Sequence, residues 1–305
     1  MTAESAVTTC YRHPRVESHV RCTRCDRYIC PSCMREASVG HQCVGCVKEG
    51  ARTVRQARTV FGGRISAVPL VTYVLIGLNV LAYLAELARS SVVDRFGMLG
   101  AGLRDTDGAH YLWQYPYGSM HAEGLVGGEW ERLLTSAFLH MPPDEGIGVL
   151  HLVMNMASLW TVGRVVEAQL GRVRYLALYL LSALGGSVLV LLAAPDTLTI
   201  GASGAIFGLG AAYYVMGRRL GYDMRSVNQH MGGLLLWLVL SAWVTSWEAH
   251  LGGLLAGGAV TLAYAYAPRD GRRTLVQTGA CVALLALLLV LALVKVSDLT
   301  GGAGV

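Results

Sequence analysis

The sequence has little charge for its length. Only 15% of its 305 residues are Asp, Glu, Lys or Arg, and 53% are hydrophobic. Soluble domains carry about a quarter charged residues, so this composition, with a mean hydropathy of +0.46, excludes an ordinary soluble protein and indicates a membrane protein. Lysine is scarcer still, with only Lys48 and Lys295. That bias indicates a GC-rich genome and says nothing about mechanism.

The N-terminal 60 residues lack any run of seven apolar residues, so we expect no secretory signal there. Seven of the eight cysteines nevertheless lie between Cys10 and Cys46. Closely paired cysteines without a secretory signal favour metal binding in a reducing compartment over disulfide bonds. Residues 1–64 also hold 11 Lys or Arg and 5 Asp or Glu, a net charge of +6, whereas the remainder has a net charge of −1. This segment therefore suits anionic lipid headgroups or an acidic partner.

Four ligand pairs, each with two residues between its members, occupy this segment. They are Cys10 and His13, Cys22 and Cys25, Cys30 and Cys33, and Cys43 and Cys46. Eight ligands in four pairs suit two tetrahedral Zn²⁺ sites. The pattern is similar to cross-braced zinc fingers of the B-box kind, in which pairs one and three share one ion and pairs two and four the other. Pairing in sequence order stays open.

The role of this zinc-binding segment has two interpretations. It either binds a protein partner or only folds a stretch too small to build its own core. We expect no nucleic-acid partner, because its basic residues have a use at a membrane surface. Membrane lipids are an expected partner of the chain as a whole.

From about Val68 onward the chain is a series of apolar stretches. A span needs about 20 apolar residues, and it should be helical because lipid leaves no other partner for backbone N–H and C=O groups. The sequence predicts an all-α polytopic membrane protein with seven spans: 68–87, 148–166, 174–193, 199–217, 230–247, 249–267 and 275–296. The regions are a Cys/His domain at 1–50, a basic linker at 51–66, a six-helix core at 67–268, and a seventh span with an external tail at 269–305.

The placement of arginine predicts the orientation of the spans. The links after spans two, four and six each carry three arginines, whereas the short links after spans three and five carry none. By the positive-inside rule the arginine-rich links are cytoplasmic. We expect a cytoplasmic N-terminus and an external C-terminus. The arginines are Arg164, Arg172, Arg174, Arg218, Arg219, Arg225, Arg269, Arg272 and Arg273.

Four polar residues lie near the start of spans two, four and six, which run in the same direction. These are His151 and Asn155, then Ser203, then His250, and the topology brings them to one depth below the outer surface. Singly, Ser203 among small residues suits helix packing, either histidine could bind a haem or relay protons, and Asn155 could bond a neighbouring helix. Together they predict a water-accessible site.

These residue types can divide the work of amide hydrolysis. A serine hydroxyl is a weak nucleophile until a base takes its proton, and a neutral imidazole can do so near pH 7. Ser203 and His250 are therefore candidate nucleophile and base. His151, Asn155 and the backbone N–H of Ser203 are candidate donors to the oxyanion. Glu248 lies two residues from His250, on another helix face, so we expect a dyad and not a triad.

Three motifs resemble those of the rhomboid intramembrane serine proteases in order and spacing. They are Gly201-Ala-Ser-Gly204, Ala249-His250-Leu-Gly-Gly and His151-Leu-Val-Met-Asn155. The resemblance covers roughly residues 65–267 and implies a six-helix rhomboid core, to which some relatives add a seventh helix. It also implies Ser203 as nucleophile, His250 as base, His151 with Asn155 as the oxyanion site, and no cofactor for catalysis. Substrates would be single-span membrane proteins with a helix-weakened segment and small residues at the cut, in the plasma membrane of a bacterium.

Further residues extend the resemblance. Phe207 takes the place of an aromatic that packs on the base in some members, and Gly253 and Gly257 match a small-residue contact between spans four and six. The stretch from Gly128 to His140 resembles the first external loop of the family. Within it the chain has Glu131-Arg132 where the family often has Trp-Arg, and Pro142–Gly146 lengthens the link to His151. The loop residues singled out are Trp130, Arg132 and His140.

Two other functions compete with proteolysis. A catalytically dead rhomboid relative could bind or chaperone membrane proteins, but intact Ser203 and His250 argue against it. A transporter or haem protein with a metal-binding regulatory domain is the other alternative. Transporters tend toward paired repeats and broken helices, and the sequence has no sign of them.

Overall fold

The computed structural model describes residues 7–53, 57–113, 120–241 and 246–301. The chain divides into two compact units, Met1–Ala57 and Arg58–Val305. The linker expected at 51–66 straddles this boundary. Its second half belongs to the helical unit, because Phe61 is fully buried in the core of that unit.

The first unit is small and has an interior made largely of cysteine. Its core consists of Ile29 and six of the seven cysteines of the segment, with Cys25 packed against it. Two antiparallel pairs, β1 with β2 and β3 with β4, hold the ligand pairs in place. The elements are β1 (Thr9–Cys10), β2 (His13–Glu17), η1 (Pro31–Cys33), β3 (Met34–Glu36), β4 (His41–Cys43) and α1 (Val44–Thr53).

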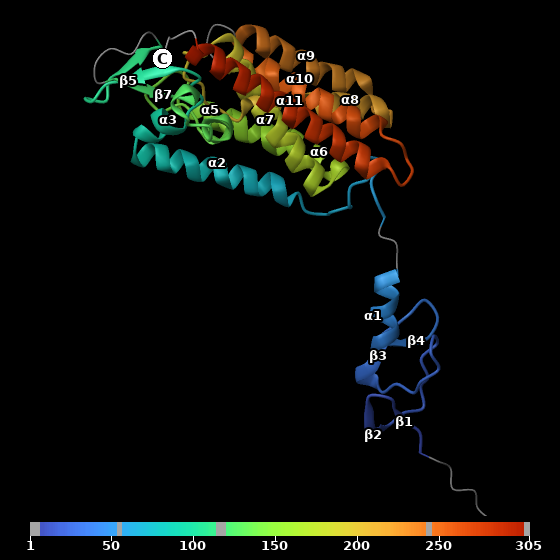
Figure 1. The fold of residues 1–305 in the computed structure, drawn as a ribbon. Helices are drawn as coiled ribbons and strands as arrows, with labels where there is room; N and C mark the ends of the chain where they lie inside the picture. Colours follow the sequence, from blue (N-terminus) through green and yellow to red (C-terminus); the bar gives the residue numbers. More distant parts are fainter. Residues whose placement is uncertain (1–6, 54–56, 114–119, 242–245, 302–305) are drawn as a thin grey trace, which may run out of the picture. The chain divides into compact units, whose positions relative to one another are not determined.

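The second unit is a bundle of long helices with a small sheet at one end (Figure 1). Each predicted span coincides with a helical segment. The helices are α2 (Leu70–Ala88), α5 (Val149–Ser158) continued by the π-helical η4 (Leu159–Gly163) and α6 (Arg164–Leu170), α7 (Arg172–Ala193), α8 (Ser203–Leu220), α9 (Met224–Ser241), α10 (Trp247–Tyr266) and α11 (Arg273–Gly301).

The segment between α2 and α5 forms its own layer of short elements. Strand β5 lies between β6 and β7 in an antiparallel sheet of three strands, and Figure 1 places this sheet beside α3. The elements are α3 (Ser91–Phe96), β5 (Gly102–Arg104), β6 (His110–Leu112), β7 (His121–Glu123), η2 (Leu125–Gly127), α4 (Arg132–Thr135) and η3 (Ser136–Phe138).

The predicted start of a span differs from the start of its helix by four or more residues at two places. Helix α8 begins at Ser203 and not at 199, because Gly201 has a φ of +131°, which no α-helix accommodates. Helix α9 begins at Met224, six residues before the predicted span at 230, because polar residues extend the helix beyond its apolar part. Its predicted end at 242–247 falls largely outside the described residues.

Four of these segments are long and apolar enough to cross a membrane, within the part of the chain that the structure describes. They are 70–88, 149–170, 172–193 and 273–301. The others, α8, α9 and α10, contain glycine and polar residues, which lower the mean hydropathy of a helix. Their crossing of the membrane stays a prediction.

Helices α7, α8 and α10 pack together at the centre of the second unit. Helices α8 and α10 touch through their backbones. A Cβ added at Gly253 would collide with the carbonyl oxygen of Gly204, and one added at Gly257 would collide with the Cα of Gly208. Such close approach is typical of small residues at helix contacts in membranes. It brings the first turns of α8 and α10 together.

Candidate functional site

A tight turn delivers Ser203 to the start of α8. Gly201 has a φ of +131°, which side-chain-bearing residues rarely adopt, and its N–H donates to the Ser136 carbonyl oxygen at 2.9 Å. A Cβ at Gly201 would lie 3.1 Å from His151 Nε2 and 3.5 Å from Ser203 Oγ. Glycine is therefore needed here on both counts. As the first helical residue, Ser203 has a backbone N–H without an intrahelical acceptor.

The His250 imidazole meets Ser203 across the contact between α8 and α10. Its Nε2 atom lies 2.8 Å from Ser203 Oγ, and the side chain is 2% exposed. The Phe207 ring stacks on the imidazole, with centroids 4.4 Å apart and 13° between the planes. At this distance the hydroxyl can donate to an imidazole nitrogen and transfer its proton to it.

His151 and Asn155 lie on one face of α5, beside Ser203. The Nδ1 atom of His151 accepts a hydrogen bond from the Met141 N–H at 3.2 Å. A neutral imidazole has one N–H, so this bond fixes the proton on Nε2, the nitrogen on the side of Gly201, two residues before Ser203. Asn155 donates from Nδ2 to the His151 carbonyl oxygen at 2.8 Å, which holds the amide in place. Both side chains can therefore offer donors next to the Ser203 hydroxyl.

All four of these residues line one cavity of about 140 Å³. A water molecule takes about 30 Å³ of liquid volume, so the cavity has room for several waters. Its walls are mostly apolar apart from the polar group just described. The remaining lining residues are Ile147, Met154, Ser158, Ile206, Phe207, Leu234 and Trp237.

Arg132 anchors the loop layer beside the site. It is fully buried, and its guanidinium donates to Glu129 at 2.7 Å, to Glu123 at 3.1 Å and to the carbonyl oxygens of Asp94 and Gly97 at 2.7 and 2.8 Å. Two carboxylates and two carbonyl oxygens thus satisfy one buried charge. Trp130 packs against a nearby cluster of apolar residues that includes Leu133.

His140, also part of the expected loop motif, packs against the His151 ring. The two rings have centroids 5.2 Å apart, and neither nitrogen of the fully buried His140 ring has a partner among the described residues. Burial, together with neighbouring His151, lowers the pKa of His140 to about 3, so the ring is neutral. Its backbone N–H donates to both carboxylate oxygens of Glu86 at 3.2 Å.

Glu86 is a site neighbour that the sequence reasoning missed. It is 5% exposed, and Asn79 and Tyr83 are buried on the same face of α2. A signal was available. Positions 79, 83 and 86 follow helical spacing within an otherwise apolar span, and polar residues inside a span mark its buried face.

Comparison with known proteins identifies the helical unit. A model of the rhomboid domain matches residues 127–268. The chain is 32% identical over 142 residues to a putative rhomboid protease, YdcA, of Bacillus subtilis (strain 168), covering 44% of this chain and 67% of that protein. The chain belongs to the rhomboid family. The three resembling motifs all lie within the matched rhomboid domain.

Two other relatives share a smaller part of their length with this chain. It is 33% identical over 165 residues to the rhomboid protease GluP of Bacillus subtilis (strain 168), covering 52% of this chain and 31% of that protein. It is 33% identical over 156 residues to RHOMBOID-like protein 6, mitochondrial, of Arabidopsis thaliana, covering 48% of each. The chain therefore spans about a third to a half of these two relatives.

The metal-ligand pairs lie outside the matched rhomboid domain and form two groups. Cys10, His13, Cys30 and Cys33 make one, and the second is Cys22, Cys25, Cys43 and Cys46. Within each group the ligand atoms all lie within 4.8 Å of one another. Pairs one and three therefore meet, as do pairs two and four, which is the cross-braced arrangement and not pairing in sequence order.

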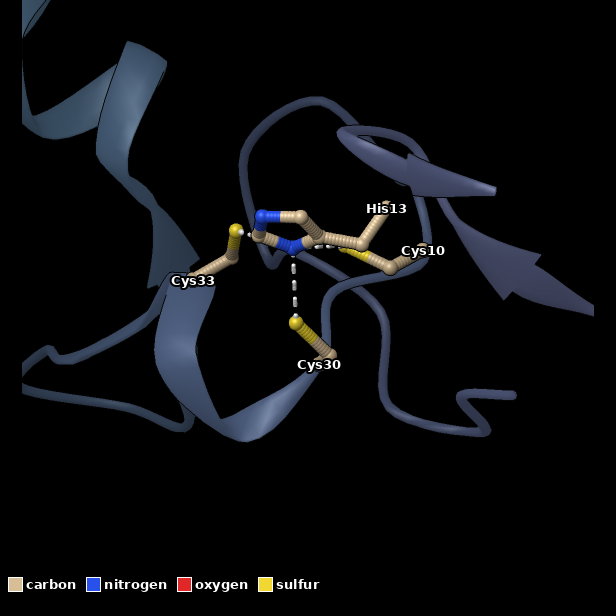
Figure 2. A group of neighbouring side chains, drawn as sticks. All are labelled: Cys10, His13, Cys30 and Cys33. Atoms are coloured by element: carbon tan, nitrogen blue, oxygen red, sulfur yellow. Dashed lines mark hydrogen bonds between the residues drawn. The ribbon is translucent and has the colours of Figure 1, made fainter. Parts of the chain in front are cut away.

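The first group has the dimensions of a tetrahedral zinc site. Figure 2 shows the His13 ring among the three sulfur atoms. Its Nδ1 atom lies 3.2 Å from Cys30 Sγ, 3.5 Å from Cys33 Sγ and 3.8 Å from Cys10 Sγ. Ligands about 2.0–2.3 Å from one Zn²⁺ would have similar spacings. Both groups could hold zinc.

Proposed function

We propose that this chain is an intramembrane serine endopeptidase that hydrolyses peptide bonds of transmembrane proteins with Ser203 and His250. One observation carries the proposal: the 2.8 Å approach of His250 Nε2 to Ser203 Oγ within a cavity that has room for several waters. Membership of a family with named protease relatives supports it. The intact pair argues against a catalytically dead relative.

In the proposed reaction, Ser203 Oγ attacks the carbonyl carbon of the scissile bond and passes its proton to His250 Nε2. The tetrahedral intermediate collapses, the C–N bond breaks, and His250 returns the proton to the leaving amine nitrogen. Water then attacks the acyl-enzyme ester, with His250 again taking the proton and returning it to Ser203. The stacked Phe207 ring keeps the imidazole facing the hydroxyl.

The intermediate carries a negative oxygen that needs donors. We assign this role to His151 Nε2–H, the Asn155 amide and the Ser203 backbone N–H. The hydrogen bond from the Met141 N–H supports the assignment of His151, because it leaves the ring proton on the side of Ser203. The loss of one such donor typically lowers the rate about 10²–10³-fold.

The remaining proposals concern placement and the N-terminal segment. The chain would cross the plasma membrane of a bacterium seven times, with a cytoplasmic N-terminus and an external C-terminus. Its substrates would be single-span proteins with a helix-weakened segment and small residues at the cut. The first unit would bind two Zn²⁺ and, through that fold, a protein partner.

The test of the protease proposal is cleavage of a model transmembrane substrate by the purified full chain in detergent. We expect wild-type protein to cleave it, and Ser203→Ala and His250→Ala each to abolish cleavage. Ser297→Ala, on the exposed face of α11, and His121→Ala, exposed on β7, are the matched controls and should retain wild-type rates. Cleavage that survives both dyad substitutions would rule out the mechanism.

A further inference from the structure

Four arginines gather where α7 and α11 begin. Arg58 opens the second unit, Arg174 lies in the first turn of α7, and Arg269 and Arg273 lie just before and at the start of α11. The positive charges of Arg58, Arg174 and Arg269 all act on the Arg273 guanidinium. Side chains from three separate parts of the chain thus converge on one place.

A glycine turn forms the centre of this cluster. A Cβ added at Gly62 would lie 3.1 Å from Arg273 Nε and 3.4 Å from Arg174 Nη2, so the two guanidinium groups are neighbours. Arg58 Nη1 donates to the Gly62 carbonyl oxygen at 3.3 Å, and Arg273 Nη2 donates to the Val60 carbonyl oxygen. The turn therefore holds three guanidinium groups close together.

A buried amide fixes the base of the cluster. Gln277, 2% exposed, accepts a hydrogen bond from Arg174 Nε at 2.7 Å and donates to the carbonyl oxygens of Phe61 and Tyr264 at 3.2 and 3.1 Å. Arg273 Nε is buried and has no hydrogen-bond partner among the described residues. Hydrogen bonds thus hold Arg174 and Gln277 in place at the base of the cluster.

No carboxylate pairs with the cluster in the part of the chain that the structure describes. Among the described residues, none of the four arginines takes part in an ion pair, and the nearby Asp270 carboxylate pairs instead with Arg272 at 3.0 Å. Two helices of 22 and 29 residues begin here, and their positive dipole ends add to the same potential. Like charges at this spacing repel, so the site calls for an anion.

We propose that this arginine cluster binds the phosphate group of an anionic phospholipid. Arginine matches phosphate oxygens with paired N–H donors, and α7 and α11 are both long and apolar enough to span a membrane. Arginines at the ends of such helices lie at the level of lipid headgroups, where basic pockets between helices bind anionic lipids. The lipid chains would lie along the apolar helix surface below the headgroup.

The test is native mass spectrometry of the full chain in detergent, titrated with phosphatidylglycerol and, separately, with phosphatidylcholine. We expect wild-type protein to retain phosphatidylglycerol preferentially. The Arg174→Gln/Arg273→Gln double variant should lose roughly fivefold in affinity for each arginine removed. The matched control is Arg218→Gln/Arg225→Gln, which removes the same charge from exposed positions outside the cluster and should change affinity less than threefold.

Two outcomes would overturn the proposal outright: no preference for phosphatidylglycerol in the wild type, or equal losses of affinity in both double variants. A third outcome would assign the site to free phosphate. It is displacement of the lipid by millimolar inorganic phosphate, together with equal stabilisation of the protein by phosphate alone. If the double variant does not fold, judged by size-exclusion chromatography, Arg58→Gln replaces it. Arg58 is exposed, and its substitution should still cost a few-fold in phosphatidylglycerol affinity, whereas unchanged affinity would refute its part in the site.

Discussion

The two units of this chain are held together by different means. The interior of the first is made of cysteines around Ile29, and those cysteines are also the candidate zinc ligands. The core of the second is an extended cluster of apolar side chains, with α8 and α10 in backbone contact at glycines. A segment of about 50 residues buries too little apolar surface to fold on that alone, whereas the helical unit has ample surface to bury.

This difference predicts that each unit can be broken without the other. Metal binding supplies folding free energy in small zinc domains, about 10–16 kcal/mol per structural site. We expect no such dependence in the helical unit, because its cohesion comes from packing. Substitution of the metal ligands should therefore destabilise only the first unit, and substitution of the glycines at the α8–α10 contact should destabilise only the second.

Zinc removal should have the largest effect. We expect about two zinc ions per chain by metal analysis, and chelation should expose the first unit to trypsin while the helical unit keeps its thermal transition. Cys43→Ser should reduce zinc to about one ion per chain. Cys281→Ser, outside the ligand groups, should leave it at two. A chelated chain whose first unit still resists trypsin would contradict this account.

Metal analysis also tests which ligand pairs share one zinc ion. Cys10→Ser/Cys30→Ser places both substitutions in one group, so the double variant should keep one zinc ion. Cys10→Ser/Cys22→Ser places one substitution in each group, so zinc should fall close to zero. Reversed results would mean that the pairs join in sequence order.

A methyl group at Gly253 should have the next largest effect, confined to the helical unit. Gly253→Ala places a Cβ against the Gly204 carbonyl oxygen, and such overpacking costs about 1–3 kcal/mol. It should also separate Ser203 from His250 and lower turnover about 10²-fold, since a misplacement of about 1 Å costs that much. Zinc content should not change.

Gly258→Ala is the matched control, on the same helix. Its Cβ would meet only the Ala211 side chain at 3.8 Å, an ordinary contact. Stability and turnover should therefore stay near wild type or rise slightly with helix propensity. Equal losses in both variants would show that close α8–α10 packing is not what positions the pair.

Most of this architecture could be predicted from the apolar segments and the order of the motifs in the sequence. Spans show in hydropathy because lipid demands about 20 apolar residues and a helix. The start of α8 at Ser203 could not be predicted from hydropathy, because it depends on the φ of Gly201. The partners of Arg132 could not be predicted either, since Glu123 and Asp94 come close to it only in the folded loop layer. Contacts between distant segments leave no periodic trace in a single sequence.

The variant with the smallest expected effect on stability separates function from folding within the helical unit. Asn155 lines the cavity, and among the described residues its side chain hydrogen-bonds only to the His151 carbonyl oxygen of its own helix, so Asn155→Ala should change the thermal midpoint little. If its amide stabilises the oxyanion, kcat should fall about 10²–10³-fold, or about 2.7–4 kcal/mol, with KM within a few-fold of wild type. Ser158→Ala, which also removes a polar group from the cavity wall, should leave kcat nearly unchanged. A KM that rises as much as kcat falls would mean that Asn155 binds the substrate in its ground state, and the oxyanion assignment would then pass to His151 and the Ser203 backbone alone.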